Sequence, residues 1–423
     1  MSAQPPQGSE PARAADPSAP DPSGLSFWSA PAEQEPARPE PRPPRYGQAS
    51  IADLLSSAAG ALGAEGFDDV LGLPQAQRIV VVLVDGLGLE QLAARSGCAP
   101  FLRGAQDLGE LDAAFPSTTA SSLAALGTGQ PVGVHGLTGY DSFSPELGVA
   151  VNMLGGWDER VDPLHWQPTP TVLQRLEDQD IDAVTVSRGK FRDSALTRAA
   201  LRGGRFVAAE GVFARTRAAQ ENLRAGRRAL MYFYWDDLDK TGHRHGWGST
   251  QWSEALEELD SSLRRLVSAL PKETAVVLSA DHGMVDVPPE GRRDVSELPG
   301  LLQDVRSSAG EPRCLQLHLR ETASAQERLE LLDGLRSRWE ASELGPRVLV
   351  RTREELVEAG WFGPAGQLRP EVLGRIGDLV VIPREEDLAL HDLSRIGHRT
   401  LAMVGQHGAM TSAETRVPLL RLA

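Results

Sequence analysis

The sequence predicts an α/β protein in which a mostly parallel sheet lies between two layers of helices. Short apolar runs alternate with amphipathic segments along most of the 423 residues. Several of the runs are β-branched and lack polar alternation, which is typical of strands buried on both faces of a parallel sheet. Hydrophobic residues make up 41% of the chain, which is enough for a large core. Alternating strands and helices favour helices on both faces of one sheet.

The apolar runs predict eight strands. They are Ile79–Val84, Ala183–Val186, Ala229–Trp235, Ala275–Ser279, Leu315–Leu319, Val348–Arg351, Leu379–Ile382 and Leu401–Val404. Helical periodicity is clearest in Trp252–Leu270, where leucines recur every three or four residues, and in Ser324–Trp339. An earlier helical pattern starts near Ser50–Leu55 and marks the expected beginning of ordered structure.

The N-terminal region has a different composition from the rest of the chain. Residues 1–45 hold 12 of the 30 prolines, so this segment buries too little apolar area to offset the entropy of ordering. We therefore expect residues 1–47 to form a disordered tail and residues 48–423 to form the folded domain.

Composition excludes several classes of protein. The formal net charge of −15 argues against a surface that binds nucleic acid, because such a surface must be cationic. Cys98 and Cys314 are the only cysteines, too few for a disulfide framework or a cysteine metal cluster. No apolar run approaches the ~20 residues of a membrane span. No secretory signal is visible, so cytoplasmic residence is expected. The sequence leaves the oligomeric state open.

Acidic residues and histidines follow four of the predicted strands, each with a glycine close by. In parallel sheets, functional side chains gather at the carboxyl ends of the strands. Each feature alone is equally well explained by a turn or a charged surface loop. Four strands that end in the same way indicate one shared site. The residues are Asp85 after the first strand, Asp239, His243 and His245 after the third, Asp281 and His282 after the fourth, and His407 after the last.

These oxygen and nitrogen donors suit divalent cations. Six of them, three carboxylates and three imidazoles, can hold two ions with three protein ligands each, which leaves coordination free for substrate or water. The six are Asp85, Asp239, His243, Asp281, His282 and His407. A mixed shell of aspartate and histidine favours zinc, with manganese next.

A cluster of hydroxyl residues precedes a helix-forming run at Leu123–Leu126. The segment Pro116–Ser122 contains two threonines and three serines. One interpretation is a helix N-cap. The other is a hydroxyl nucleophile at a helix N-terminus, where free N–H groups and the helix dipole favour an anion such as phosphate. A neighbouring divalent cation would lower the pKa of such a hydroxyl, so the two clusters support each other.

Five short motifs in this order resemble the type I phosphodiesterase/nucleotide pyrophosphatase family of the alkaline phosphatase superfamily. The resemblance extends from about Ile79 to Pro418 and implies that residues 48–423 form a phosphodiesterase-like catalytic domain. It is weaker between about residues 286 and 399, which are expected to form a small α+β insert near the site. The motifs are Val84-Asp85-Gly86; Phe115-Pro116-Ser117-Thr118-Thr119 with Thr128-Gly129 and His135-Gly136; Asp239-Lys240-Thr241-Gly242-His243; Asp281-His282-Gly283-Met284; and Gln406-His407-Gly408.

The resemblance implies an alkaline phosphatase-like three-layer sandwich and a role for each matching residue. The nucleophile is expected at Thr119, three residues after Pro116 and nine before Thr128, in contact with the metal ions. Thr118 is the second residue to test. One cation is expected on Asp85, Asp281 and His282, and the other on Asp239, His243 and His407.

The chain departs from the family at one position that bears on the substrate. The family's phosphate-contacting asparagine is replaced by Tyr140, which we expect, with His245, to contact substrate. The expected function is hydrolysis of a small phosphodiester or of a nucleotide phosphoanhydride through a phosphothreonine. The alternatives are a phosphomonoesterase, a phosphonate hydrolase or a phosphomutase of the same superfamily, and a protein that binds metal without turnover.

Overall fold

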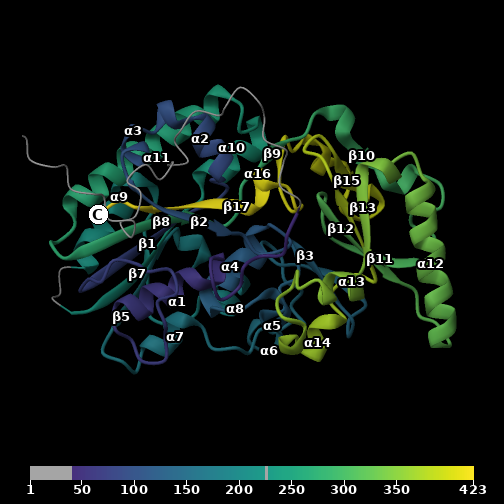
Figure 1. Ribbon diagram of the computed structural model, residues 1–423, viewed down its shortest axis with the longest axis horizontal. Coiled ribbons are helices and arrows are strands. Elements are labelled where there is room, and N and C mark those ends of the chain that lie inside the picture. Colours follow the sequence, from purple (N-terminus) through teal and green to yellow (C-terminus); the bar gives the residue numbers. More distant parts are fainter. Residues whose placement is uncertain (1–40, 224–226) are drawn as a thin grey trace, which may run out of the picture.

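The computed structural model of the protein describes residues 41–223 and 227–423 (Figure 1). Most of the predicted disordered tail, residues 1–40, lies outside the described residues. No helix in the two described ranges is both long enough and apolar enough to cross a membrane.

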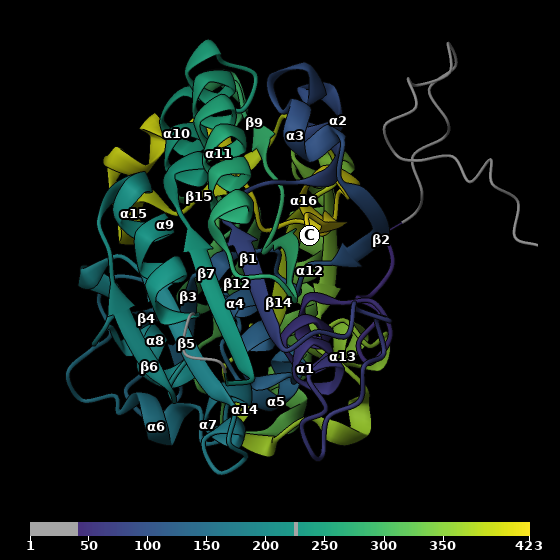
Figure 2. The same cartoon turned by 90° about the vertical axis from the view of Figure 1, so that its left-hand side faces the viewer.

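A seven-stranded sheet forms the centre of the larger part of the molecule, in the order β2-β17-β8-β1-β7-β5-β6. Only β17 runs antiparallel to its neighbours β2 and β8, so the predicted mostly parallel sheet is confirmed. Figure 2 shows β1 and β7 side by side in the same direction. The strands are β1 (Arg78–Val84), β2 (Gln106–Asp112), β5 (Asp182–Ser187), β6 (Arg205–Ala208), β7 (Ala229–Trp235), β8 (Thr274–Ala280) and β17 (Arg416–Arg421).

Helices cover both faces of this sheet, which makes the predicted three layers. In Figure 1, α9, α10 and α11 lie on one side of the sheet, and α1, α4 and α7 lie on the other. Every residue of β1 and β7 is buried, as apolar strands between two helical layers require. The helices are α1 (Ile51–Ala61), α2 (Leu89–Ala94), α3 (Pro100–Arg103), α4 (Thr119–Thr128), α5 (Val132–His135), α6 (Pro163–Trp166), α7 (Val172–Leu176), α8 (Ala195–Ala200), α9 (Gly211–Asn222), α10 (Asp237–His245) and α11 (Thr250–Ala269).

A second sheet of six antiparallel strands packs beside the first, in the order β13-β14-β12-β11-β3-β4. Helix α12 (Ala325–Ala341) buries Leu332, Leu335 and Trp339 and lies at the end of the molecule remote from β1 (Figure 1). The strands are β3 (Asp141–Ser144), β4 (Val149–Asn152), β11 (Val305–Glu311), β12 (Cys314–Leu319), β13 (Val348–Thr352) and β14 (Leu379–Pro383). Because β3 and β4 precede residue 286, this sheet combines two separate parts of the chain. The division into a catalytic domain and an insert stays a prediction.

Short elements complete the chain between and after these sheets. They are α13 (Arg353–Glu358), α14 (Pro370–Leu373), α15 (Leu393–Ile396), α16 (Ser412–Thr415), and two small strand pairs, β10 (Arg292–Asp294) with β15 (Ala389–His391) and β9 (Val285–Asp286) with β16 (Gly405–Gln406).

The predicted strand Leu401–Val404 is wrong. A 3₁₀ turn occupies His398–Ala402, and β16 begins only at Gly405 and pairs with β9 outside the seven-stranded sheet. Ala402 is exposed and its apolar neighbours are only partly buried, so the run lacks the two-sided burial that its composition suggested. The N–H of Val404 instead donates to the carbonyl oxygen of His243 on α10, at 2.8 Å. His407 therefore enters the site from this segment and not from a strand of the central sheet.

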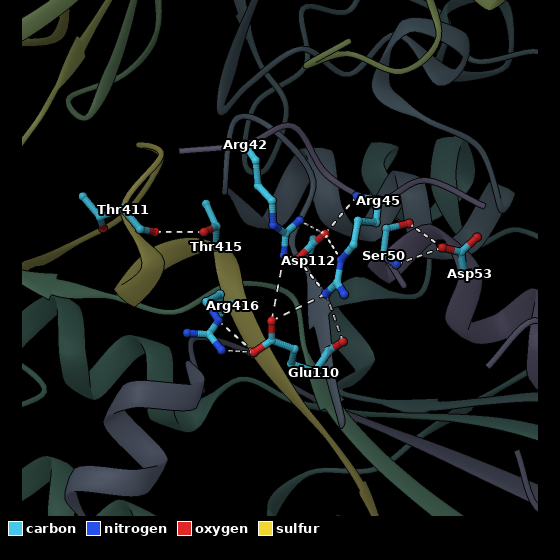
Figure 3. A network of polar contacts seen from close by, with 9 residues as sticks. All are labelled: Arg42, Arg45, Ser50, Asp53, Glu110, Asp112, Thr411, Thr415 and Arg416. Atoms are coloured by element: carbon cyan, nitrogen blue, oxygen red, sulfur yellow. Dashed lines mark hydrogen bonds and ion pairs between the residues drawn. The ribbon is translucent and has the colours of Figure 1, made fainter. Parts of the chain in front are cut away.

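The first described residues bind the end of β2 (Figure 3). Arg42 Nη1 and Arg45 Nε donate to Asp112 Oδ2 at 2.6 and 2.8 Å. Both arginines fall within the range predicted to be disordered. Ser50 and Asp53 then form a capping box that starts α1. These contacts fix Asp112, which stands directly before the loop that leads into α4.

Candidate active site

The strand register brings the first acidic residues together. Val84 at the end of β1 pairs with Trp235 of β7 and with Ala280 of β8. The next residue of each strand, Asp85, Asp236 and Asp281, therefore lies at the same edge of the sheet on three adjacent strands.

Thr119 lies at the start of α4 and points its hydroxyl at this edge. Its Oγ1 is 3.5 Å from Asp85 Oδ1 and 3.1 Å from His282 Nε2. Thr118 is the N-cap residue, and its buried Oγ1 has no hydrogen-bond partner among the described residues. The loop before them is tied to the segment after His407, because Ser117 Oγ donates to Ala409 O at 2.8 Å. The structure thus brings Thr119 beside the strand ends.

Helix α10 carries the second pair of predicted ligands. Asp239 and His243 are one turn apart on this helix, with 3.3 Å between Asp239 Oδ1 and His243 Nε2. The imidazole of His407 lies between the other two histidines: its centroid is 5.2 Å from that of His243 and 3.6 Å from that of His282. All six predicted ligands therefore converge beside Thr119. Sequence reasoning did not identify α10 as a helix.

All three histidines are oriented by the backbone. The Nδ1 atoms of His243, His282 and His407 lie 2.7, 2.9 and 2.8 Å from the carbonyl oxygens of Gly405, Gly283 and Ser117. A carbonyl only accepts, so each Nδ1 carries a proton, which leaves Nε2 as the ring atom that can bind a metal. Burial, with the other two imidazoles nearby, holds the pKa of His407 well below its usual value, so this ring is neutral.

The buried carboxylates of the site disfavour one another's ionised form. Burial and the neighbouring aspartates raise the pKa of Asp85 well above its usual value, and burial likewise raises the pKa of Asp281. Asp239 Oδ1 and Asp281 Oδ2 are buried without a hydrogen-bond partner in the described ranges. Unpartnered buried oxygens of this kind are costly unless they coordinate a metal.

The donor atoms fit divalent cations. The structure contains two groups of three residues, and within each group the ligand atoms all lie within 4.8 Å of one another. One group is Asp239, His243 and His407, and the other is Asp85, Asp239 and His282. The first is one of the two predicted triads. The second differs from the other triad because Asp239 replaces Asp281, whose Oδ2 lies 3.6 Å from His282 Nε2. Asp239 is therefore a member of both groups.

Two further residues shape this edge, and sequence reasoning missed one of them. The Tyr234 hydroxyl donates to Asp85 Oδ2 and fixes the orientation of that carboxylate. Tyr234 is two residues from Tyr232 on a buried strand, and that pattern is equally typical of a core position. Gly86 adopts a φ of +75°, and a Cβ there would lie 3.1 Å from Asp239 Cα. The glycine of the Asp85-Gly86 motif is therefore required for α10 to approach β1.

A cavity of about 600 Å³ opens above these residues and extends to the second sheet. Tyr140 lines it with a side chain that is 40% exposed. Glu311 and Arg395 line the side formed by the second sheet. His245 is exposed at the end of α10 and is not among the lining residues, so the structure does not bring it to the cavity.

Comparisons with known proteins bear on the family and the fold. The sequence profile of the family described as Type I phosphodiesterase / nucleotide pyrophosphatase matches residues 79–410. Murine ectonucleotide pyrophosphatase/phosphodiesterase 5, solved as an inactive variant with AMP, is similar with a TM-score of 0.61 and 15% identity over 81% of this chain and 87% of that one. Phosphonoacetate hydrolase from Sinorhizobium meliloti 1021, solved with phosphonoformate, has a TM-score of 0.59 and 22% identity over 83% and 91%. These likenesses confirm the predicted alkaline phosphatase-like fold.

Proposed function

The chain belongs to the type I phosphodiesterase/nucleotide pyrophosphatase family, and we propose on that basis that it hydrolyses phosphodiester or phosphoanhydride bonds of small molecules, nucleotides included. The reaction proceeds through a covalent phosphothreonine at Thr119. The observation that carries this proposal is the position of Thr119 Oγ1, 3.1 Å from His282 Nε2 and 3.5 Å from Asp85 Oδ1 at the start of α4.

Two divalent cations, zinc in the first place and manganese in the second, are the proposed cofactors. Asp85, Asp281 and His282 would hold one ion, and Asp239, His243 and His407 the other. When bound, the cations would lower the pKa of the Thr119 hydroxyl and stabilise negative charge on the phosphoryl oxygens. The unpartnered oxygens of Asp239 and Asp281 support this assignment.

The protein's own groups account for the remaining steps. Thr119 Oγ gives up its proton to solvent and forms a bond to phosphorus while the bond from phosphorus to the leaving oxygen breaks, and the leaving oxygen keeps the electron pair of that bond. The N–H groups at the start of the ten-residue helix α4 orient the phosphoryl oxygens. A water then adds its oxygen to phosphorus, the Oγ–phosphorus bond breaks, and Thr119 regains its proton.

The murine neighbour supports a threonine nucleophile and a nucleotide substrate. Its inactive form carries alanine in place of a threonine and was solved with AMP. Phosphonate hydrolysis is the second candidate, since phosphonoacetate hydrolase is among the similar structures and Tyr140 replaces the asparagine expected of a nucleotide pyrophosphatase. Assays on a diester, a monoester and phosphonoacetate separate these reactions from each other.

The test of the nucleophile is Thr119→Ala assayed on bis(p-nitrophenyl) phosphate with added zinc. Loss of the attacking oxygen should lower turnover by at least about a thousandfold. Thr119→Ser keeps a hydroxyl and should retain measurable turnover, and Thr118→Ala should remain active. Metal content and the unfolding midpoint should match those of the wild-type protein. Undiminished turnover by Thr119→Ala would exclude the proposed role.

A further inference from the structure

Glu311 is a buried carboxyl group in the wall of the cavity that neither the motifs nor the proposed reaction uses. It is the last residue of β11, where that strand turns toward β12. The residue is only 6% exposed, yet it is one of the residues that line the cavity together with Thr119.

The two oxygens of Glu311 have different surroundings. Oε2 accepts a hydrogen bond from the backbone N–H of Tyr140 at 2.8 Å. Oε1 is buried and has no hydrogen-bond partner in the part of the chain that the structure describes. A buried polar atom without a partner costs free energy, so a native site that keeps one usually has a ligand for it.

Glu311 also lies beside both loops of the reaction site. It packs against Gly408, where a Cβ would lie only 2.4 Å from Glu311 Cγ and 3.2 Å from Oε1. Gly408 follows His407 directly, and its N–H donates to Ser117 Oγ at 3.2 Å. Ser117 is two residues before Thr119. The carboxyl group is therefore a neighbour of the segments that carry the proposed nucleophile and one proposed metal ligand.

The charges that act on Glu311 disfavour its ionised form. They are Asp141 and Glu414, both negative, and each already binds its own arginine: Arg395 Nη1 and Arg313 Nη2 lie 2.7 Å from these carboxylates. Burial first, and then these two charges, raise the pKa of Glu311 well above its usual value. Burial beside two carboxylates therefore favours the uncharged acid. Because Oε2 already accepts from Tyr140, the proton belongs on Oε1.

We propose that Glu311 contacts the substrate: as a neutral carboxylic acid, its Oε1–H donates a hydrogen bond to a non-bridging oxygen of the phosphoryl or phosphonyl group bound at Thr119. The inference rests on the proposed function. A neutral donor attracts an anionic oxygen, and hydrogen bonds to charged groups are strong in a buried site, whereas an ionised glutamate would repel the same oxygen. Tyr140, which replaces the expected phosphate-contacting asparagine, holds Glu311 through its backbone.

The test compares Glu311→Gln with Glu311→Met in the full chain loaded with zinc. Glutamine keeps an uncharged donor of the same shape, whereas methionine fills a similar volume without a donor. Glu311→Met should raise the inhibition constant of inorganic phosphate and the KM for bis(p-nitrophenyl) phosphate by about tenfold to a hundredfold. Glu311→Gln should stay within about threefold of the wild-type protein. Glu311→Leu replaces the methionine variant if that variant does not fold.

Two results would overturn the inference. One is an apolar variant with unchanged phosphate inhibition and unchanged KM. The other is a glutamine variant as impaired as the methionine variant, which would require a carboxylate in this position. The proposed function fails separately, if the zinc-loaded wild-type protein turns over none of the substrates. In that case calorimetric binding of inorganic phosphate to the same three proteins still decides the role of Glu311.

Discussion

His135 of the His135-Gly136 motif is a buried imidazole whose ionisation the fold opposes. Its Nδ1 accepts the N–H of Leu137 at 3.2 Å. Burial, followed by the charges of Arg369 and Arg375, lowers the pKa of His135 from 6.5 to about 3. The folded protein therefore holds the ring neutral. Its contribution to stability is fully present only above the pKa that this histidine has in the unfolded chain. Between these two pKa values the unfolded chain binds a proton that the folded chain does not, so stability falls as the pH falls.

His135→Gln should reduce the acid sensitivity of the fold. From about pH 7 to about pH 5, His135 alone should lower the free energy of unfolding of the wild-type protein by about 2 kcal/mol. Urea unfolding at both pH values measures this loss, which should be smaller by that amount in the variant. His245→Gln, on an exposed helix end, is the control and should show the wild-type loss. Equal losses in all three proteins would contradict the prediction.

At the level of elements, the contact between α10 and β16 explains two glycines: Gly242 of one site motif, and Gly405, which directly precedes another. A Cβ at Gly405 would lie 2.6 Å from the carbonyl oxygen of Gly242 and 2.3 Å from Met284 Sδ. A Cβ at Gly242 would lie 2.4 Å from the same sulfur atom. Three segments that are far apart in the chain thus meet in one close contact, which sets the position of His243 relative to His407.

Gly405→Ala should push β16 away from α10. Overpacking of this kind costs about 1–3 kcal/mol, so the free energy of unfolding in urea should fall by that amount. Zinc binding, followed by competition with a chromogenic chelator, should weaken because His243 and His407 move apart. Gly366→Ala is the matched control, since nothing lies within 4 Å of a Cβ at that position. A variant as stable as the control, with unchanged zinc affinity, would contradict this account.

The elements that could be predicted from the sequence are those with a run or a periodic pattern of apolar residues. The strands β1, β7 and β8 could be predicted because their residues are mostly apolar, and apolar composition alone indicates a buried strand. Strand β3, with the sequence Asp-Ser-Phe-Ser, is fully buried but polar. Its polar groups bond to distant partners, such as Asp141 to Arg395, and no local pattern reveals such partners. Helix α10 has no clear apolar periodicity, so its helical state was not predicted.

The same reasoning applies to the site. The convergence of Asp85 and Asp281 could be predicted, because the carboxyl ends of adjacent parallel strands meet at one edge of the sheet. Glu311 could not, because it comes from a strand of the other sheet and approaches Gly408 only through tertiary packing. Tyr234 was missed because a tyrosine in an apolar strand is as typical of the core as of a site.

At the scale of the whole molecule, one buried ion pair joins the second sheet to the segment between His407 and β17. Arg313, at the turn between β11 and β12, binds Glu414 of α16 with both side chains fully buried. Arg313 Nη1 also donates to the carbonyl oxygen of Leu388 at 2.6 Å, and Glu414 Oε1 accepts the N–H of Ala409 at 3.0 Å. The pair therefore holds the second sheet against the segment that follows His407.

Arg313→Met should destabilise the protein by about 3–5 kcal/mol, because it leaves the buried carboxylate of Glu414 without a cation. Chemical unfolding measures the loss. The double variant Arg313→Met/Glu414→Gln should lose less than the sum of the two single losses, since no buried charge remains unpaired. Arg320→Met, which removes an exposed pair with Glu327, should change stability little. Additive single losses would show that the two groups do not act as a pair.

The attachment of residues 42–50 to β2 has a consequence for self-association. Strand β2 is at the margin of the seven-stranded sheet, and such strands offer unpaired backbone groups to other chains. The backbone N–H of Asp112 is already bonded to Ala49 O at 2.9 Å, and Ser50 bridges to the same residue. A second copy of the protein thus finds the Asp112 end of this strand occupied, and a version cut after residue 50 would expose that end to intermolecular strand pairing.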